Sequence, residues 1–220
     1  MLITLEGIEG SGKTTQMDAA SRFVRAQGYE CISTREPGGT LLGTRIRGLL
    51  LDPANADIDA TAELLLYAAD RVQHVQRIIR PALAAGRVVL CDRFIDATVA
   101  YQGYARGLGL ETIAALHRLV LGGLKPDLTL LIDVPAEVGL ARAWTAVKEG
   151  GRSRSETRFE QEALDFHRRV RDGYLALAAA EPDRFCVIDG RQGPDAVGRN
   201  ILAALARRLS SVPPDGANDG

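Results

Sequence analysis

The sequence predicts an α/β protein with a five-stranded parallel sheet that is flanked by helices. Short apolar runs of β-type alternate along the chain with longer stretches of helical period, which is the pattern of strands joined by crossover helices. The apolar runs do not alternate with polar residues, as is typical of strands buried on both faces. The composition is globular, with 46% hydrophobic and 25% charged residues, which excludes collagen-like, disulfide-scaffold and disordered chains.

Each expected strand is a short apolar run that lies between stretches of a different pattern. Length and composition therefore predict that these strands exist, while their order in space does not follow from them. The expected strands are residues 2–5, 30–34, 88–91, 128–132 and 185–188.

Seven stretches have the period of helices. In the stretch that begins at Ala60, apolar residues recur at spacings of three and four, so that one stripe can face the sheet. Glycines follow three of the stretches, at Gly28, Gly86 and the pair Gly122-Gly123, where a left-handed residue would end a helix. The expected helices are residues 13–27, 41–51, 60–85, 110–121, 136–147, 158–180 and 194–209.

The length of 220 residues favours one domain over residues 1–209, with an unstructured tail at 210–220. The interval 148–157 breaks the alternation, because it carries Gly and Ser between two helical stretches and places Arg152 and Arg154 in a loop. An arbitrary charged loop of this kind is a solvated connector. In a chain that binds polyphosphate, we expect the same interval to be a mobile lid.

The charge balance and the cysteines limit the partners and the compartment. There are 27 Lys and Arg against 28 Asp and Glu, so a nucleic-acid partner is not expected. Cys31, Cys91 and Cys186 are odd in number and widely spaced, which favours a reducing compartment. The chain opens without a secretory signal pattern, and no apolar run approaches the length that spans a bilayer. We therefore expect a cytoplasmic protein with no membrane partner.

A phosphate-binding motif follows the first expected strand. Residues 7–14 read Gly-Ile-Glu-Gly-Ser-Gly-Lys-Thr, which matches G-x-x-x-x-G-K-[ST] between a strand and a helix. Such a loop turns backbone N–H groups toward an anion, and the alternative is a glycine-rich turn without a ligand. Lys13 would reach the β- and γ-phosphates of ATP, and the Thr14 hydroxyl would ligate Mg²⁺. The expected ATP-binding residues are Gly7, Ile8, Glu9, Gly10, Ser11, Gly12, Lys13, Thr14 and Thr15.

Asp92 is the second expected metal ligand. It follows the apolar run 88–91, and the carboxyl ends of the strands in an open parallel sheet share one crevice. We expect it near Mg²⁺ through a water ligand, although many strands end in Asp for turn chemistry alone. The three histidines, His74, His117 and His167, have no metal-ligand spacing and are expected to be surface or packing residues.

The remaining residues favour a small kinase over the other P-loop classes. An N-K-x-D element, which reads guanine in GTP switches, is absent from the sequence. Transfer between two phosphates requires two polyanions to meet, and their repulsion must be offset by cations. Arginine suits this task because its planar fork binds phosphate in two places and stays charged. The arginines spread over separate loops are Arg35, Arg47, Arg71, Arg93, Arg152, Arg154 and Arg158.

Five ordered segments together resemble the thymidylate kinase family, in its bacterial type, over residues 2–209. They are residues 6–15, 34–40, 67–71, 92–94 with 100–103, and 158–160 leading into Phe166-His167. The resemblance implies a P-loop NTPase fold with a mobile lid. It also implies direct in-line transfer of the γ-phosphate of MgATP to dTMP, which forms dTDP for dTTP biosynthesis.

The resemblance further implies where the acceptor phosphate and the sugar bind. Arg47 and Arg93 would hold the dTMP phosphate, with Arg35 nearby. Glu9, the acid inside the P-loop, would contact the 3′-hydroxyl of the sugar. Glu36 would lie near Mg²⁺ and the acceptor.

For the base, the resemblance implies that Tyr67 stacks on thymine and Arg71 donates to a ring carbonyl. Thr98 and Gln102 would touch the base edge, and Tyr101 would crowd the 2′ position and so favour deoxyribose. The expected substrate-binding residues are Glu9, Arg35, Glu36, Pro37, Arg47, Tyr67, Arg71, Arg93, Thr98, Tyr101 and Gln102.

The family places its catalytic arginine either inside the P-loop or in the lid. Here the P-loop interior carries no basic residue, so the lid should supply the arginine, with Arg154 and Arg158 ranked before Arg152. Two positions depart from the family, Ala97 where Ser is common and Thr157 where Asp or Asn is common. The expected catalytic residues are Lys13, Glu36, Arg93, Arg154 and Arg158.

Two other functions stay open on the residues alone. One is a nucleoside or nucleotide monophosphate kinase with another acceptor, and the other is a P-loop ATP-dependent switch without an acceptor. The resemblance also implies a homodimer formed through packed helices, but periodicity does not separate an exposed apolar stripe from ordinary core.

Overall fold

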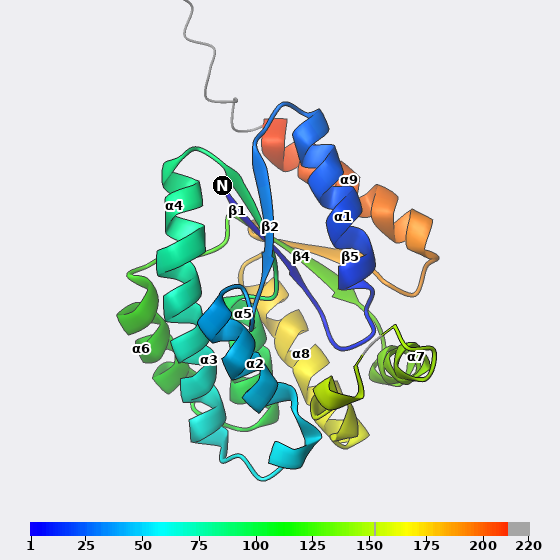
Figure 1. Cartoon of the computed structure of the whole chain (residues 1–220). Coiled ribbons are helices and arrows are strands. Elements are labelled where there is room, and N and C mark those ends of the chain that lie inside the picture. Colours follow the sequence, from blue (N-terminus) through cyan, green and yellow to red (C-terminus); the bar gives the residue numbers. More distant parts are fainter. Residues whose placement is uncertain (152, 211–220) are drawn as a thin grey trace, which may run out of the picture.

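Five parallel strands form one sheet through the middle of the molecule, in the order β2-β3-β1-β4-β5 (Figure 1). The computed structural model describes residues 1–151 and 153–210, so Arg152 and residues 211–220 of the expected tail lie outside the described residues. All five expected strands are confirmed, with ends within one residue of the expected bounds. The strands are β1 (Leu2–Glu6), β2 (Cys31–Arg35), β3 (Val88–Asp92), β4 (Leu128–Asp133) and β5 (Phe185–Asp189).

Helices cover both faces of the sheet, so the central strands β1, β3 and β4 are almost wholly buried, while the edge strands β2 and β5 are partly exposed. One face packs against α1 and α9, in a hydrophobic cluster that includes Met17 and Ile201. The opposite face packs against α8 and the segment from α3 to α5, with Ile79, Ile95 and Val170 buried there. The helices are α1 (Lys13–Ala26), α2 (Leu41–Leu51), α3 (Ala60–His74), α4 (Arg80–Ala84), α5 (Ile95–Thr98), α6 (Leu110–Leu121), α7 (Ala136–Lys148), α8 (Leu164–Ala180) and α9 (Pro194–Ser210).

Five of the expected helices are confirmed as α1, α2, α6, α7 and α9, with ends within one residue. The expected helix 60–85 is instead divided into α3, a π-helical turn at Val75–Ile79 and α4. Pro81, near the start of α4, accounts for the division. Its ring clashes with the carbonyl group four residues before it and removes a donor, and a π-helical turn relieves this locally.

Two further differences concern segments whose structure depends on tertiary contacts. The helix expected at 158–180 begins only at Leu164, because Arg158 donates its backbone N–H to Leu51 and the short 3-10 turn Phe159–Gln161 follows. Helix α5 and the π-helical segment Val99–Ala105 (η3) that continues it were not expected from the sequence. Val, Thr, Tyr and Gly have low helix propensity, so packing of η3 against α8 decides its conformation.

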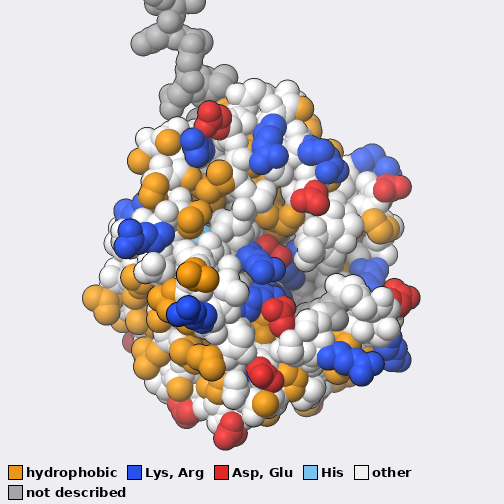
Figure 2. Space-filling model, in the orientation of Figure 1, with side chains coloured by type: hydrophobic (Ala, Val, Ile, Leu, Met, Phe, Trp, Pro, Cys, Tyr) orange, Lys and Arg blue, Asp and Glu red, His pale blue; other side chains and the backbone are white. Residues whose placement is uncertain are grey.

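The carboxyl ends of the central strands meet at one edge of the sheet and place the polar residues there. Asp92 at the end of β3 is in register with Leu5 of β1 on one side and with Arg35 of β2 on the other. Figure 2 shows Lys and Arg side chains gathered with acidic ones in a hollow at this edge. In the described residues, no helix combines the length and the apolar character that crossing a membrane requires.

Candidate active site

The P-loop lies between β1 and α1, and two of its glycines are required by its conformation. Gly10 has a φ of +67°, and a Cβ atom there would lie 2.0 Å from the carbonyl oxygen of Gly139 in α7. Gly12 has a φ of +99°, but a Cβ atom there would meet no atom within 4 Å. The loop therefore touches α7 at Gly10, where only glycine fits, and needs Gly12 for conformational freedom alone.

Lys13 closes the P-loop from inside. Its ammonium group donates to the carbonyl oxygen atoms of Gly7 at 2.9 Å and Ile8 at 3.0 Å, and to Oγ of Ser11 at 3.2 Å. Burial, and after it the positive charge of Arg93, lowers the pKa of Lys13 to about 8. The hydrogen-bond acceptors of this buried ammonium group are all neutral, and a polyphosphate would give it a negatively charged partner.

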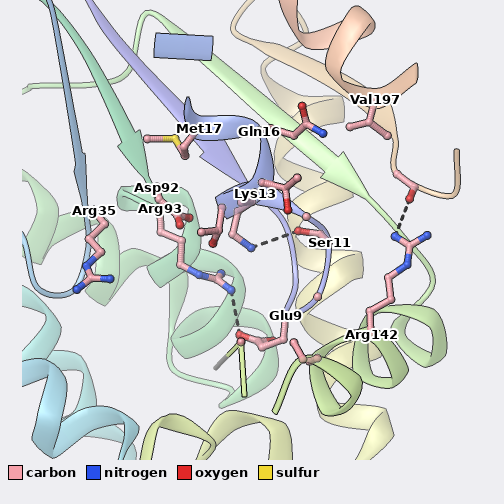
Figure 3. Close-up of a pocket in the computed structure, with 18 of the residues that line it drawn as sticks. Glu9, Ser11, Lys13, Gln16, Met17, Arg35, Asp92, Arg93, Arg142 and Val197 are labelled. Atoms are coloured by element: carbon pink, nitrogen blue, oxygen red, sulfur yellow. Dashed lines mark hydrogen bonds and ion pairs between the residues drawn. The ribbon is translucent and has the colours of Figure 1, made fainter. Parts of the chain in front are cut away.

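A large open cavity of about 1170 Å³ extends from the P-loop along α7 and the start of α9. In Figure 3, Lys13 points toward Ser11, and Arg93 reaches toward Glu9 across this cavity. Of the expected ATP-binding residues, 9–15 line the cavity, while Gly7 and Ile8 lie behind them and accept from Lys13. Further lining residues were not expected from the sequence; they include Gln16 of α1 and, from distant elements, Arg142, Arg191, Gln192 and Val197.

Asp92 and Thr14 line the same cavity, as a shared metal site requires. The Oδ1 atom of Asp92 is buried and has no hydrogen-bond partner among the described residues. Over residues 1–151 and 153–210 no cluster of three or more His, Cys, Asp or Glu side chains could hold a metal ion. One carboxylate and one hydroxyl fit Mg²⁺ that takes its other ligands from phosphates and water.

A second, smaller cavity of about 70 Å³ lies between α3, η3 and the 3-10 turn at Phe159. The structure brings together here every expected substrate-binding residue except Arg35, which lines the large cavity instead. Ala97, one of the departures from the family, lines the small cavity too. The lining residues that were expected are Glu9, Glu36, Pro37, Arg47, Tyr67, Arg71, Arg93, Thr98, Tyr101 and Gln102.

The two cavities meet at four charged side chains. Glu9, Glu36, Arg47 and Arg93 line both of them. Anions bound in the two cavities would therefore face each other across two guanidinium and two carboxylate groups. This arrangement allows group transfer between two phosphates, because cations stand where the negative charges would meet.

Glu9 is fixed at this junction by hydrogen bonds to its Oε1 atom. Arg93 donates to Oε1 at 2.9 Å, and the Tyr101 hydroxyl donates to the same atom at 2.6 Å. Burial alone would raise the pKa of Glu9, but the guanidinium of Arg93 and contacts with His167 and Tyr101 hold the pKa well below its usual range. Glu9 is therefore an ionised acceptor at neutral pH.

Arg71 is the best-anchored residue of the small cavity, with an exposed fraction of 2%. Its guanidinium donates to Glu36 at 2.6 Å, to the Thr98 hydroxyl at 2.8 Å and to the backbone carbonyl group of Phe94 at 3.0 Å. It also lies 3.2 Å from Nε2 of His117 in α6. Burial and the charge of Arg71 lower the pKa of His117 to about 3, so His117 is neutral and accepts this hydrogen bond.

All three histidines that were expected to be surface or packing residues belong to the network around the site, and Nδ1 of His167 lies 3.3 Å from Oε2 of Glu9. His117 contacts Arg71, and His74 lies 2.8 Å from Glu36 and 2.6 Å from the Thr34 hydroxyl. One signal could have found His74, because it lies three residues after Arg71 on the same face of α3. His117 had no such signal, since α6 reaches Arg71 only in the fold.

The interval 148–157, expected as a lid, begins at the end of α7 and contains the 3-10 turn Arg154–Glu156. Its Glu156 binds Arg47 in two places, at 2.9 Å and 2.8 Å. Arg47 also donates to the carbonyl group of Pro37 at 3.0 Å. A carboxylate of this interval therefore occupies the guanidinium that the resemblance assigns to the acceptor phosphate.

The structure does not bring Arg154 or Arg158 into either cavity. Arg158 is 3% exposed, binds the buried Glu63 of α3 and donates to the carbonyl group of Leu50. Arg154 is exposed and lines neither cavity, and Arg152 lies outside the described residues. The catalytic roles of Arg154 and Arg158 stay predictions, and for Arg158 the role requires release from Glu63.

The fold and the phosphate-binding loop define a P-loop nucleotide-binding protein, with a second cavity beside the first. Comparison with known proteins then identifies the family. The family model described as thymidylate kinase matches residues 5–201. The chain belongs to the thymidylate kinase family.

Individual thymidylate kinases are similar to this chain over nearly its whole length. A thymidylate kinase from Desulfosudis oleivorans is 55% identical over 94% of this chain and 97% of its own length. One from Geobacter sulfurreducens is 51% identical over the same shares of both chains, 94% and 97%. The crystal structure of thymidylate kinase from Ehrlichia chaffeensis superimposes with a TM-score of 0.72 at 36% identity, covering 93% of this chain and 98% of that chain.

Proposed function

We propose that this protein transfers the γ-phosphate of ATP to dTMP, with ADP and dTDP as products, by direct in-line transfer. The observation that carries this proposal is the meeting of the two cavities at Glu9, Glu36, Arg47 and Arg93. Membership of the thymidylate kinase family supports dTMP as the acceptor.

On the donor side, ATP would lie in the large cavity with its phosphates in the P-loop. The N-terminus of α1 presents backbone N–H groups and the positive end of its dipole to the same place. Lys13 would release its carbonyl acceptors and donate to the β- and γ-phosphates, which favour its charged form. Arg142 and Gln192, at the far end of the cavity, are placed to contact the nucleoside part.

On the acceptor side, dTMP would lie in the small cavity with its phosphate at the junction. Arg93 and Arg47 would bind that phosphate, with Arg35 reaching it from the large cavity. Arg71, held by Glu36 and Thr98, would present its guanidinium at the base edge.

The sugar and the base would contact the remaining side chains of the small cavity. Glu9 would accept from the 3′-hydroxyl, and Tyr101, fixed against Glu9 at 2.6 Å, would fill the space of a 2′-hydroxyl. Tyr67 offers an aromatic face to the ring, and Gln102 lies beside it with its amide held by Glu63 at 2.7 Å. These contacts would favour a deoxynucleotide with a flat base.

Thr14 and Asp92 would hold Mg²⁺ together with the ATP phosphates. The unpartnered, buried Oδ1 atom of Asp92 fits a water ligand of such an ion. When bound, the ion neutralises charge on the β- and γ-phosphates. Lys13 and Arg93 would stabilise the rest of the developing charge, and closure of the interval 148–157 would exclude water from it.

The experiment that tests the function is a steady-state assay of ADP formation with ATP and each of dTMP, dUMP, UMP, CMP and AMP. We expect dTMP to give the highest kcat/KM and to accelerate ADP formation by orders of magnitude over ATP alone. Preference for a ribonucleotide would contradict the role of Tyr101 and favour another monophosphate kinase. No acceleration by any acceptor would favour an ATP-dependent switch.

We propose in addition that the protein is a homodimer through α2, α3 and α6. These helices carry large apolar side chains that the chain itself leaves exposed, including Leu41 at 78% and Leu119 at 82%. Figure 2 shows hydrophobic side chains gathered on this side of the molecule. Light scattering after size exclusion should give twice the chain mass, and Leu119→Glu should reduce it to one chain; a monomeric wild-type protein would contradict the proposal.

A further inference from the structure

Arg93 has an unusual backbone conformation, which its contact with Glu9 does not explain. Its φ is +69°, and it is the only non-glycine residue in the described part of the chain with a positive φ. This conformation is unfavourable for a residue with a long side chain and persists only where surrounding contacts enforce it. The contacts that enforce it therefore decide where the guanidinium of Arg93 points.

Three contacts hold the backbone of this turn. The N–H of Arg93 donates to the carbonyl group of Leu5 at 3.1 Å, and the Cys91 thiol lies 3.0 Å from the carbonyl oxygen of Arg93. The next N–H, that of Phe94, donates at 2.7 Å to Oε1 of Glu6. The contact with Glu6 is the shortest of the three and is the only one made by the side chain of a residue outside the turn.

The second oxygen atom of Glu6 reaches the other end of Arg93. Oε2 accepts from the Tyr174 hydroxyl at 2.7 Å, and that hydroxyl accepts from Nη1 of Arg93 at 3.1 Å. Glu6 is thus bonded to the backbone beside Arg93 and, through Tyr174, to its guanidinium. The other terminal nitrogen of the guanidinium, Nη2, is directed at Glu9.

Neither Glu6 nor Tyr174 touches the space that substrates would occupy. Both are buried, at 0% and 1% exposure, and neither lines the large or the small cavity. Burial, reinforced by the nearby Asp96, raises the pKa of Glu6 to about 7, so an acid is kept here despite a free-energy penalty for its charge. The hydrogen bonds of Glu6 to the Phe94 N–H and to the Tyr174 hydroxyl offset part of this penalty.

Glu6 is also the last residue of β1, and the next residue along the chain is Gly7, the first residue of the P-loop. The same side chain that holds the Arg93 turn therefore lies at the base of the loop that would hold the donor. A shift of the Glu6 carboxylate would change the distance between the donor phosphates and Arg93.

We propose that Glu6 and Tyr174 are positioning residues that fix the guanidinium of Arg93 at the junction of the two cavities. The inference rests on the proposed function, in which Arg93 binds the acceptor phosphate. Glu6 holds the backbone of the turn, and Tyr174 holds the side chain through its hydroxyl group. Neither residue touches the reacting atoms.

The test is the variant Tyr174→Phe, which removes one hydroxyl and leaves the ring in the core. We expect the KM for dTMP to rise about tenfold, because a hydrogen bond that involves a charged group is lost, while the KM for ATP changes less than twofold. Tyr29→Phe is the matched control, since the Tyr29 hydroxyl donates to the carbonyl group of Leu209 at 3.1 Å, far from both cavities. It should leave both KM values unchanged.

A second arm separates positioning from a general loss of structure. In the Arg93→Lys background, Tyr174→Phe should have little further effect on the KM for dTMP, because its effect acts through the guanidinium. Glu6→Gln should raise the same KM by at least as much as Tyr174→Phe does. Thr4→Val, which removes a buried hydroxyl from the same strand, is the control for Glu6→Gln.

The outcome for the positioning role and the outcome for the proposed function can be distinguished. Turnover of dTMP by the wild-type protein tests the proposed function, while the ratio of variant to wild type tests the positioning role. An unchanged KM for dTMP in Tyr174→Phe would overturn the inference, and so would an undiminished effect in the Arg93→Lys background. Equal rises in the KM values for ATP and dTMP would also overturn it, since they would indicate a general loss of structure.

Discussion

The P-loop directs its polar groups with the backbone of one short segment, whereas the small cavity directs its groups with side chains from distant segments. In the P-loop, Gly10 and Gly12 determine the path of the chain, and Lys13 donates from the start of α1 to the carbonyl groups of the loop. In the small cavity, Arg71 is aimed by Glu36 from the end of β2 and by Thr98 from α5. The first site depends on local conformation, and the second depends on how the helices pack.

This difference predicts how each site fails. A change at the P-loop glycines or at Lys13 should affect ATP and leave dTMP binding intact, while a change in the network of the small cavity should affect dTMP and the stability of the fold together. The following five predictions test this separation, from the largest expected effect to the smallest.

Lys13→Ala should lower kcat by two to three orders of magnitude, by analogy with the loss of other groups that stabilise transition-state charge. Lys13 lines the large cavity but not the small one, so the Kd for dTMP should stay within about twofold. Steady-state kinetics and titration calorimetry measure the two quantities. Near-normal turnover would remove the P-loop from the mechanism, and a large loss of dTMP affinity would show that the two sites are not separate.

Arg71→Lys should raise the KM for dTMP about a hundredfold, because lysine cannot reproduce the fork that contacts Glu36, Thr98 and Phe94. It should also lower the free energy of unfolding by about 3 kcal/mol, since the buried Glu36 loses a partner. Kinetics and urea denaturation measure these effects. Arg25→Lys is the control and should change neither value, because Arg25 is exposed, lines neither cavity and donates to the carbonyl group of Cys31 at 2.9 Å.

Gly10→Ala and Gly12→Ala compare a steric clash with backbone strain alone. Both positions have positive φ, but only at Gly10 would the new methyl group meet backbone, 2.0 Å from the carbonyl oxygen of Gly139. We expect the KM for ATP to rise about tenfold or more in Gly10→Ala and less in Gly12→Ala, where strain of about 1 kcal/mol is the only penalty. The KM for dTMP should be constant in both. An equal effect of the two variants would show that contact with α7 does not shape the loop.

Tyr101→Phe removes the hydroxyl that donates to Glu9 at 2.6 Å. The KM for dTMP should rise about fivefold, because Glu9 retains Arg93 but loses its second donor. Acceptor assays with dTMP and its ribose counterpart should show a smaller preference for deoxyribose. An unchanged preference would assign discrimination at the 2′ position to other groups.

The last expected effect leaves catalysis at neutral pH unchanged: the network of the small cavity makes the free energy of unfolding depend on pH. The pKa of His117 is lowered to about 3 by burial and by Arg71, from an ordinary value of 6.5. A histidine whose pKa is lowered by folding favours the neutral form, so its contribution to stability is present above pH 6.5 and is lost as the pH falls toward 3. Between pH 7 and 5 this amounts to about 2 kcal/mol.

His117→Asn should reduce this loss while keeping an acceptor for Arg71. Urea denaturation at pH 7 and pH 5 measures the change in the free energy of unfolding. The variant His167→Asn, at another buried histidine, is measured in the same way for comparison. An identical pH dependence in wild type and His117→Asn would contradict the assignment.

The same difference explains what the sequence could predict. The strands and the P-loop follow from contiguous patterns, and the resemblance to the family as a whole predicts ten residues that line the small cavity. The π-helical segment η3 escaped prediction because its Tyr, Val and Gly residues disfavour a helix until α8 packs on them. Tyr174 escaped because an aromatic residue at helical spacing is ordinary core by pattern, and only the fold brings its hydroxyl to Arg93.

The contacts of Arg158 in the expected lid could not be predicted from the sequence pattern. Arg158 lies in a segment shared with the family, yet in the structure its guanidinium is buried against Glu63. The sequence contains both residues, but 95 positions separate them along the chain. Charge and spacing alone therefore do not decide whether an arginine faces a ligand or another part of its own chain.

The contact between Arg47 and Glu156 has a consequence for how the acceptor enters. Arg47 and Glu156 are joined by two hydrogen bonds. Under the proposed function, an incoming phosphate would displace this carboxylate rather than fill a vacant guanidinium. Entry would then be an anion exchange, with a smaller net electrostatic gain than the phosphate contact alone would give. Because such competition is reciprocal, whatever keeps Glu156 on Arg47 would weaken the binding of the phosphate, and the phosphate would in turn release Glu156.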